Sequence, residues 1–188
     1  EYDTGSAIEA APMILADSLY VGNEDGKLCA IKLADGSLRW QYKTGDKIVG
    51  STNWLAHPAK SASMPSGARI LVGSYDSTLH CIDSASGEAL WKYEAESFIN
   101  GAPTVFAGGK SVAFGCCDNN VYVLSSADGA KVSTVDAGSQ IAGSPAAAVF
   151  TFASSSAMRR SCSAIRLDAA KNARLSTSFP MRQDGLVI

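Results

Sequence analysis

The chain has 188 residues, of which 46% are hydrophobic, and its formal net charge is −2. These values suit a soluble globular chain with one domain and a sizeable core. The sequence also excludes a membrane-spanning helix, because no apolar run approaches the ~20 residues that such a helix needs. The five cysteines are an odd number without framework spacing, which argues against a disulfide-stapled fold.

Three copies of one pattern organise the chain. Each copy has a glycine after a β-branched or aromatic residue, and these glycines are 51 and 42 residues apart (Gly22, Gly73 and Gly115). A second glycine, in a later turn, repeats with the same two separations (Gly36, Gly87 and Gly129). Trp40 and Trp91 are also 51 residues apart. A period of this length, with about four short strands per copy, predicts β-propeller blades that bury their faces by stacking on one another.

The first repeat, residues 5–45, alternates short apolar runs with turn residues. Its strands are predicted at residues 11–15, 19–22, 27–32 and 38–42. We expect the first of these strands to be buried. The pairs Asp25-Gly26 and Asp35-Gly36 predict tight turns between the later strands, because glycine readily adopts the positive φ that such turns require.

The second and third repeats, residues 46–95 and 96–138, follow the same order, and a fourth begins at residues 139–147. Their first strands are predicted at residues 48–55 and 99–106. The second repeat carries an inserted loop, residues 57–67, which is rich in Ala, Ser and Pro. Long loops on such a fold often bind ligands, but this composition offers little chemistry, so a plain connection is favoured.

Residues 148–188 form a basic tail, rich in Ser and Ala, that does not continue the repeat pattern. From residue 151 onward, six Lys and Arg stand against two Asp and Glu, and there is no Trp or Tyr. Residues 164–175 place apolar side chains on one side of a short helix, although a helix of this length needs packing to be stable. The pattern therefore predicts an irregular or short-helical tail. A basic tail suits an anionic partner, but a loosely packed terminus is the favoured interpretation.

Aspartates recur at one turn position of the three repeats (Asp25, Asp76 and Asp118). A calcium site needs several oxygen ligands that converge from one loop, and these turns supply too few. Hydrogen bonding within each turn is therefore the favoured role. Neither His57 nor His80 has a partner at metal-ligand spacing, so no metal site is predicted. The acidic repeat region also argues against nucleic acid as a partner.

The repeats resemble those of the pyrroloquinoline-quinone (PQQ) repeat family, the β-propellers similar to quinoprotein alcohol dehydrogenases. The resemblance rests on residues 22–40 and 73–91, where the glycines, the turns and a terminal Trp recur, and it extends over residues 5–147. It implies an all-β partial propeller of about three four-stranded antiparallel blades. In this family the terminal Trp docks between blades, a role that falls to Trp40 and Trp91. Ser133 replaces the third Trp, so the third blade is expected to dock more weakly. WD-repeat propellers are ranked lower, because neither a Trp-Asp nor a Gly-His pair occurs.

The resemblance alone does not decide between a binding protein and an enzyme, because the family contains both. A non-catalytic scaffold or protein-binding fragment of a larger bacterial propeller protein is favoured, with no cofactor and with a protein or peptide bound at the blade-face loops. The alternative is a fragment of a PQQ-dependent dehydrogenase that uses calcium and a set of ligands which the sequence does not assemble. In that alternative, Cys116 and Cys117 form the adjacent-cysteine disulfide that the family's enzymes hold against the quinone. Their alignment with ordinary turn positions favours a structural role.

Three further expectations concern ligands, self-association and cellular location. Trp54 is the one loose candidate for an aromatic platform of a sugar-binding propeller. Open blade edges predict self-association, since an unpaired sheet flank attracts another. The residues leave the compartment unknown, and the resemblance implies a periplasmic or extracytoplasmic location.

Overall fold

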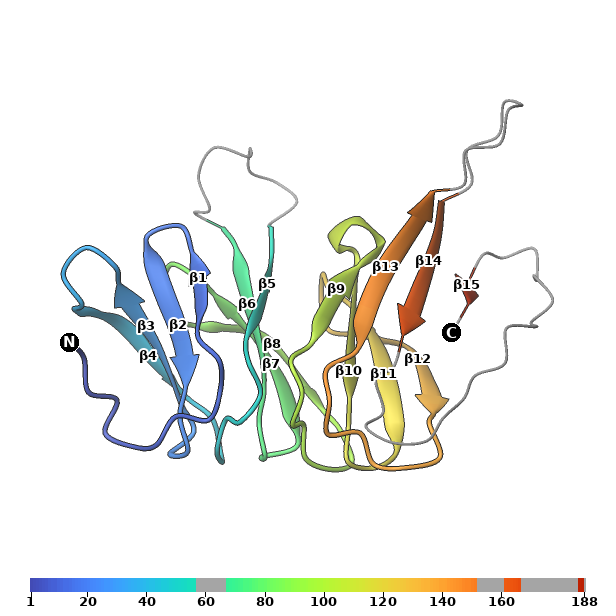
Figure 1. Cartoon of the computed structure of the whole chain (residues 1–188), viewed down its shortest axis with the longest axis horizontal. Helices are drawn as coiled ribbons and strands as arrows, with labels where there is room; N and C mark the ends of the chain where they lie inside the picture. The colour runs from blue at the N-terminus through green and yellow to red at the C-terminus, as the bar shows by residue number, and fades with distance from the viewer. Residues whose placement is uncertain (57–66, 152–160, 167–185, 188) are drawn as a thin grey trace.

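The structure is a computed structural model that describes residues 1–56, 67–151, 161–166 and 186–187. Three four-stranded antiparallel sheets stand side by side, as Figure 1 shows. This confirms the predicted all-β fold of about three blades. Within these ranges the helical content is a single 3-10 turn, η1 (Ala107–Gly109), and no helix there is long and apolar enough to cross a membrane.

Each blade follows the chain order. The first strands of the second and third blades contact one another, so the first strand of a blade is called inner and the fourth strand outer. The first blade consists of β1 (Met13–Leu15), β2 (Ser18–Gly22), β3 (Lys27–Lys32) and β4 (Leu38–Lys43). The second consists of β5 (Asn53–Leu55), β6 (Arg69–Gly73), β7 (Thr78–Asp83) and β8 (Ala89–Glu94). The third consists of β9 (Thr104–Phe106), β10 (Ser111–Gly115), β11 (Asn120–Ser125) and β12 (Lys131–Asp136).

The third and fourth strands of every blade share one irregularity. The pairing register shifts after Ala30 in the first blade, after Cys81 in the second and after Val123 in the third. These residues pair with Trp40, Trp91 and Ser133, respectively. A bulge re-aims the side chains beside it. Because it occurs at the same position in each of the three blades, the repeats match in backbone detail as well as in strand order.

The apolar core lies between the blades rather than inside any one of them. Side chains of β2, β3 and β4 pack with those of β6 and β7 in one cluster, and side chains of the second and third blades form another. The largest fully buried side chains include Phe114, Leu28 and Leu79. Each blade therefore depends on its neighbour for burial, as expected for stacked repeats.

The linkers between blades are held by an isoleucine seated on a glycine. A Cβ placed on Gly22 would lie 2.2 Å from a methyl carbon of Ile48, and one on Gly73 would lie 2.3 Å from Ile99. Both isoleucines have no exposed surface. Close contact of this kind needs a residue without a side chain, which explains why a glycine ends the second strand of each blade.

The first strands differ from the prediction. β5 begins at Asn53 and β9 at Thr104, because the residues before them form the inter-blade linkers that carry Ile48 and Ile99. The expected burial of the first strand is also wrong, since Ile14 in β1 is 62% exposed. β1 is an edge strand of its sheet that pairs with β2 alone among the described strands, so one of its sides is left open.

The tail also differs from the prediction where it is described. β13 (Ala146–Thr151) pairs antiparallel with β14 (Ser161–Arg166), which pairs parallel with β15 (Leu186–Val187). The predicted helix is therefore wrong at residues 164–166, which form part of β14. A short helix without packing is only marginally stable, whereas here the backbone pairs with a neighbouring strand. The rest of that helix, residues 167–175, and residues 57–66 of the inserted loop lie outside the described residues.

Candidate functional site on the lower face of the blades

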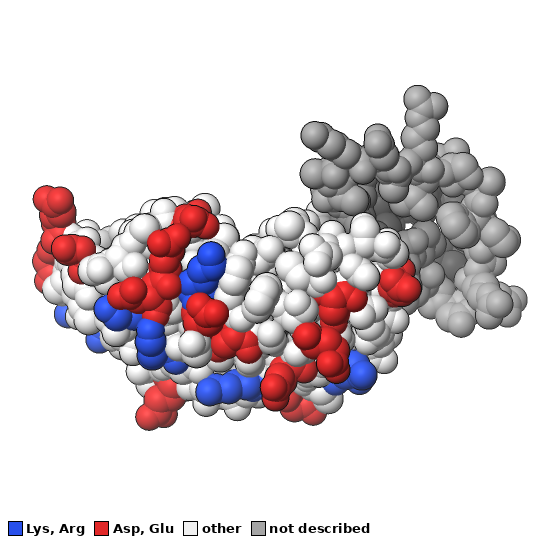
Figure 2. All heavy atoms as spheres, turned by 90° about the horizontal axis from the view of Figure 1, so that it is seen from below, with Lys and Arg blue, Asp and Glu red and all other residues white. Residues whose placement is uncertain are grey.

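The lower face is the edge of the blades at the bottom of Figure 1. It consists of the turns between second and third strands, residues 23–26, 74–77 and 116–119, and of the linkers, residues 44–48 and 95–99. Figure 2 looks onto this face and shows acidic side chains in several groups, with fewer basic side chains between them. Turns and linkers from different blades meet here, so it is the face where side chains from separate repeats form one surface.

A side-chain donor at the start of each turn ties the preceding linker to the blade. Asn23 donates to the carbonyl oxygen of Thr4 at 3.1 Å, and Ser74 donates to that of Asp46 at 2.9 Å. Cys116 takes the same place in the third blade, where its thiol lies 3.1 Å from a linker carbonyl oxygen. Sequence reasoning missed this shared role, although all three donors directly follow the repeated glycine.

The two adjacent cysteines are placed differently from each other. Cys116 and Cys117 are free thiols, the first buried and the second partly exposed. Burial raises the pKa of Cys116 to about 11, and burial together with the charge of Asp118 raises the pKa of Cys117. Thiolates are the reactive forms of cysteine, so neither environment activates a nucleophile.

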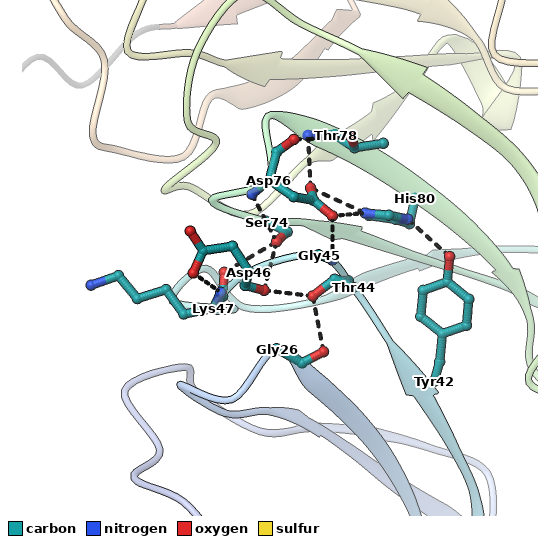
Figure 3. A network of polar contacts seen from close by, with 10 residues as sticks. All are labelled: Gly26, Tyr42, Thr44, Gly45, Asp46, Lys47, Ser74, Asp76, Thr78 and His80. Carbon is teal, nitrogen blue, oxygen red and sulfur yellow. Dashed lines mark hydrogen bonds and ion pairs between the residues drawn. The ribbon is translucent and has the colours of Figure 1, made fainter.

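Asp76 is the centre of a polar network at the junction of the first two blades, as Figure 3 shows. Its carboxylate accepts hydrogen bonds from the backbone N–H of Gly45 at 2.7 Å and of Thr78 at 3.0 Å. Nε2 of His80 lies 3.1 Å from the same carboxylate, and Nδ1 lies 3.0 Å from the hydroxyl of Tyr42. In the neutral ring we assign the proton to Nε2, because a carboxylate can only accept and the tyrosine can donate to Nδ1.

This network holds the junction together rather than performing chemistry. His80 is 3% exposed and both of its ring nitrogens have partners. Burial by itself raises the pKa of Asp76, but the hydrogen bonds from His80 and from Gly45 outweigh it and lower the pKa to about 2. The carboxylate is thus stabilised by Thr78 and His80 of the second blade and by Gly45 of the preceding linker. Tyr42 of the first blade contacts the other side of the histidine ring.

Acid is expected to weaken this junction. Because folding lowers the pKa of Asp76 from 3.8 to about 2, its contribution is complete above about pH 4 and is lost as the pH falls through about 2. We expect Asp76→Asn to lower the free energy of unfolding by about 1 kcal/mol near pH 6, allowing for solvent screening, and by much less near pH 2. Urea unfolding of both proteins at these two pH values measures the difference. A difference that does not change with pH would contradict the role of the charge.

The other two turn aspartates act locally. Asp118 accepts from the N–H of Asn120 at 2.9 Å and from the hydroxyl of Tyr122, and burial and this carboxylate raise the pKa of that tyrosine. Asp25 forms an exposed ion pair with Lys27 at 3.3 Å. Among the described residues, no group of three or more His, Cys, Asp or Glu side chains could hold a metal ion.

The turns that carry the second repeated glycine lie at the opposite, upper edge. Asp35 accepts a hydrogen bond from the N–H of Ser37 at 2.9 Å, which closes the turn of the first blade. The glycines of the predicted turns have φ from +71° to +76°, the left-handed region that favours glycine (Gly26, Gly36, Gly87 and Gly129). The sequence-predicted residues are therefore divided between two edges and do not form one site.

The two repeated tryptophans cross the blade junctions. The indole of Trp40 lies on Gly87 of the second blade and its Nε1 donates to the carbonyl oxygen of Ser84 at 2.9 Å. Trp91 lies on Gly129 of the third blade in the same way, and its Nε1 donates to Ser126 at 3.2 Å. Trp54 is separate from both, on inner strand β5, and is 40% exposed.

An aromatic pair on the lower face was not identified from the sequence. The rings of Tyr75 and Phe98 are stacked, with centroids 4.9 Å apart and planes 8° apart. Nζ of Lys47 lies 4.4 Å from the centre of the tyrosine ring, and Phe98 is 46% exposed. Tyr75 comes from a turn while the other two come from successive linkers, so only the assembled blades bring them together. Stacked rings with an exposed face offer a rigid apolar contact surface.

Comparison with known proteins agrees with this architecture. The family model described as outer membrane protein assembly factor BamB matches residues 3–56 and 43–172. No curated protein matches the chain. Among solved structures, BamB from Moraxella catarrhalis is similar with a TM-score of 0.58 and 20% identity over 71% of this chain and 38% of that one. Two computationally designed proteins are also similar. Ika8 has a TM-score of 0.59 and 18% identity over 73% of this chain and 39% of its own. Ika4 has a TM-score of 0.61 and 17% identity over 75% of this chain and 80% of its own.

These structural likenesses show the fold, and the chain spans less than half the length of BamB and of Ika8. The family model extends over more than half of the chain and includes all three described blades. This chain therefore belongs to the PQQ-repeat β-propeller family of the outer membrane protein assembly factor BamB.

Proposed function

We propose that this chain is a non-catalytic, protein-binding part of a propeller, and that its partner contacts the lower face around Phe98. The observation that carries the proposal is the stacked pair of Tyr75 and Phe98. It joins a turn of the second blade to the linker that follows that blade, and it leaves nearly half of the phenylalanine exposed. Aromatic side chains held rigidly in this way lose little conformational entropy when a partner covers them, and they are frequent anchors of protein interfaces.

The surroundings of the pair favour a polypeptide partner. Nζ of Lys47 lies 4.4 Å from the centre of the tyrosine ring, and Asp46 and Asp76 are the sequence neighbours of Lys47 and Tyr75. Charged residues therefore border the apolar pair, as in an interface with an apolar centre and a polar rim. The matching family is named for an assembly factor, which is a protein that acts on other proteins. By the same likeness we propose an extracytoplasmic location for the parent protein.

The alternative of a PQQ-dependent dehydrogenase has less support. The adjacent cysteines, which would contact the quinone in that alternative, lie in a turn where Cys116 bonds to a linker carbonyl oxygen. Incubation of the chain with PQQ and calcium, followed by absorbance and dye-reduction measurements, tests this alternative directly.

The lower face can be tested by site-specific photo-cross-linking in cells of the source organism. A photoreactive residue at position 98 is expected to capture a protein that the same residue at position 90 does not, because Leu90 is similarly exposed at 48% but lies on outer strand β8. The captured protein, once purified, should bind Phe98→Ala at least about tenfold more weakly than the wild type, and Leu90→Ala equally well. Equal capture at both positions, or unchanged binding by Phe98→Ala, would refute this site.

A further inference from the structure

The aromatic stack on the lower face ends at a partly open ring. Nζ of Lys47 lies over the ring of Tyr75, 4.4 Å from its centre, and the ring of Phe98 stacks on that of Tyr75 with centroids 4.9 Å apart. Because Tyr75 covers one face of Phe98, the exposed surface of the phenylalanine ring is its other face and its edge. Among the described residues, neither a further ring nor a cation lies over Phe98.

The repeat explains why the stack stops there. The N–H of Tyr75 donates to the carbonyl oxygen of Lys47, and the N–H of Cys117 donates to that of Phe98, both at 3.0 Å. Phe98 therefore occupies the repeat position of Lys47, and Cys117 occupies that of Tyr75. A cysteine side chain is too small to continue a row of rings. The stack thus has a lysine at one end and an open ring at the other.

The charges of the lower face are unequal. Its turns and linkers contain six Asp and Glu but one basic residue, Lys47 (residues 23–26, 44–48, 74–77, 95–99 and 116–119). The other lysines at this end of the blades contact the first blade, at Asp25 or at the ring of Tyr42 (Lys27, Lys43 and Lys92). The part of the face that carries Phe98 is therefore acidic.

Two carboxylates belong to the surroundings of Phe98. Glu96 is exposed in the same linker, and Asp118 follows the cysteine whose N–H bonds to the carbonyl oxygen of Phe98. Burial raises the pKa of Tyr93, and the charges of Glu96 and Asp118 raise it further, which places both carboxylates near one hydroxyl group. Glu96 forms no ion pair with any described residue. An aromatic face beside unpaired negative charge is a favourable site for a cation.

We propose that the partner of the lower face, whose existence rests on the function proposed above, binds through a basic segment and places an arginine side chain on the open face of Phe98. The guanidinium group is planar, so it can stack on the ring while its N–H groups bond to the carboxylate of Glu96. It would repeat, at the open end of the stack, the contact that Lys47 makes with Tyr75. The same carboxylates would repel an acidic polypeptide or a nucleic acid.

The test uses short peptides of defined charge on the purified full chain. The probe is acetyl-Ser-Arg-Gly-Arg-Ser-amide, and two matched peptides carry Lys or citrulline in place of Arg. Lysine keeps the charge without the planar group, and citrulline keeps a planar group without the charge. Titrations at low salt, followed by the amide NMR signals of the labelled chain, measure binding. We expect the arginine peptide to bind at least about fivefold more tightly than the citrulline peptide and about threefold more tightly than the lysine peptide.

Variants of the chain show where the peptide binds. Phe98→Ala should weaken binding of the arginine peptide at least about threefold, and Phe98→Leu should weaken it as much, because it keeps an apolar side chain but lacks the aromatic face. Glu96→Gln should weaken it about twofold. The matched control is Glu88→Gln, since Glu88 is also exposed but lies beside the upper-edge turn of the same blade. It should leave binding unchanged.

The proposal would be overturned if the arginine peptide bound no better than the citrulline or the lysine peptide. Unchanged binding by Phe98→Ala, or no binding to the wild type at millimolar peptide, would overturn it as well. These results would not affect the lower-face test, because cross-linking at position 98 detects a partner of any chemistry. Cross-linking that captures no specific protein, beside peptides that behave as expected, would refute the cellular partner and not the arginine site on Phe98.

Discussion

Replacement of Trp40 by alanine is expected to lower the free energy of unfolding by about 3–5 kcal/mol, the usual cost of deleting a buried large aromatic side chain. The indole is 8% exposed, packs near Tyr20 with ring centroids 5.7 Å apart, and bonds to the carbonyl oxygen of Ser84 in the next blade. Its removal would leave a cavity in the cluster that joins the first two blades and an acceptor without its best donor. The melting temperature should fall by roughly 10 °C.

Trp54→Ala is the matched control, because it deletes the same side chain from a position that is 40% exposed on an inner strand. It should cost about 1 kcal/mol or less. Trp40→Phe separates the two contributions of the buried indole, since it retains a ring but removes the Nε1 hydrogen bond, which is worth about 1 kcal/mol. Urea unfolding followed by circular dichroism measures all three. Similar losses for Trp40→Ala and Trp54→Ala would contradict a junction role for Trp40.

The strand order of the blades was predictable because it depends on local features that repeat. Turn glycines with positive φ and alternating apolar residues are determined within a few residues of chain, and β3 matches its predicted bounds. The starts of the first strands were not predictable in this way. Ile48 continues an apolar run, but its side chain fills the space over Gly22 in a linker. Periodicity does not distinguish an apolar residue of a strand from one that packs in a linker.

The candidate site was less predictable, because its contacts join different repeats. His80 was expected to have no partner at metal-ligand spacing, and the structure places it between Asp76 and Tyr42. One signal was available: the turn aspartate and the side chain four residues later recur together, as Asp76 with His80 and Asp118 with Tyr122. The partner from the preceding blade depends on the stacking of whole sheets, which no short stretch of sequence encodes.

Gly73→Ala is expected to destabilise the second junction by about 2–3 kcal/mol, a typical cost of overpacking a well-filled core. The new methyl group would lie 2.3 Å from a methyl carbon of Ile99 and 2.9 Å from its Cβ. Gly73 does not have a left-handed φ, so the cost comes from crowding and not from backbone strain. The substitution should push the linker away from the blade and weaken the hydrogen bond from the N–H of Ile99 to the carbonyl oxygen of Ser74, now 3.2 Å long.

A double-mutant cycle with Ile99→Ala shows whether the glycine acts through this contact. Ile99→Ala alone should cost about 2–5 kcal/mol, because it empties a fully buried site. In the double variant the added methyl group occupies part of the space that the isoleucine leaves, so the combined loss should fall short of the sum by at least about 1 kcal/mol. The remaining Cβ at 2.9 Å keeps the rescue partial. Strictly additive losses, measured by urea unfolding, would mean that the repeated glycine serves its own strand and not the seating of the next linker.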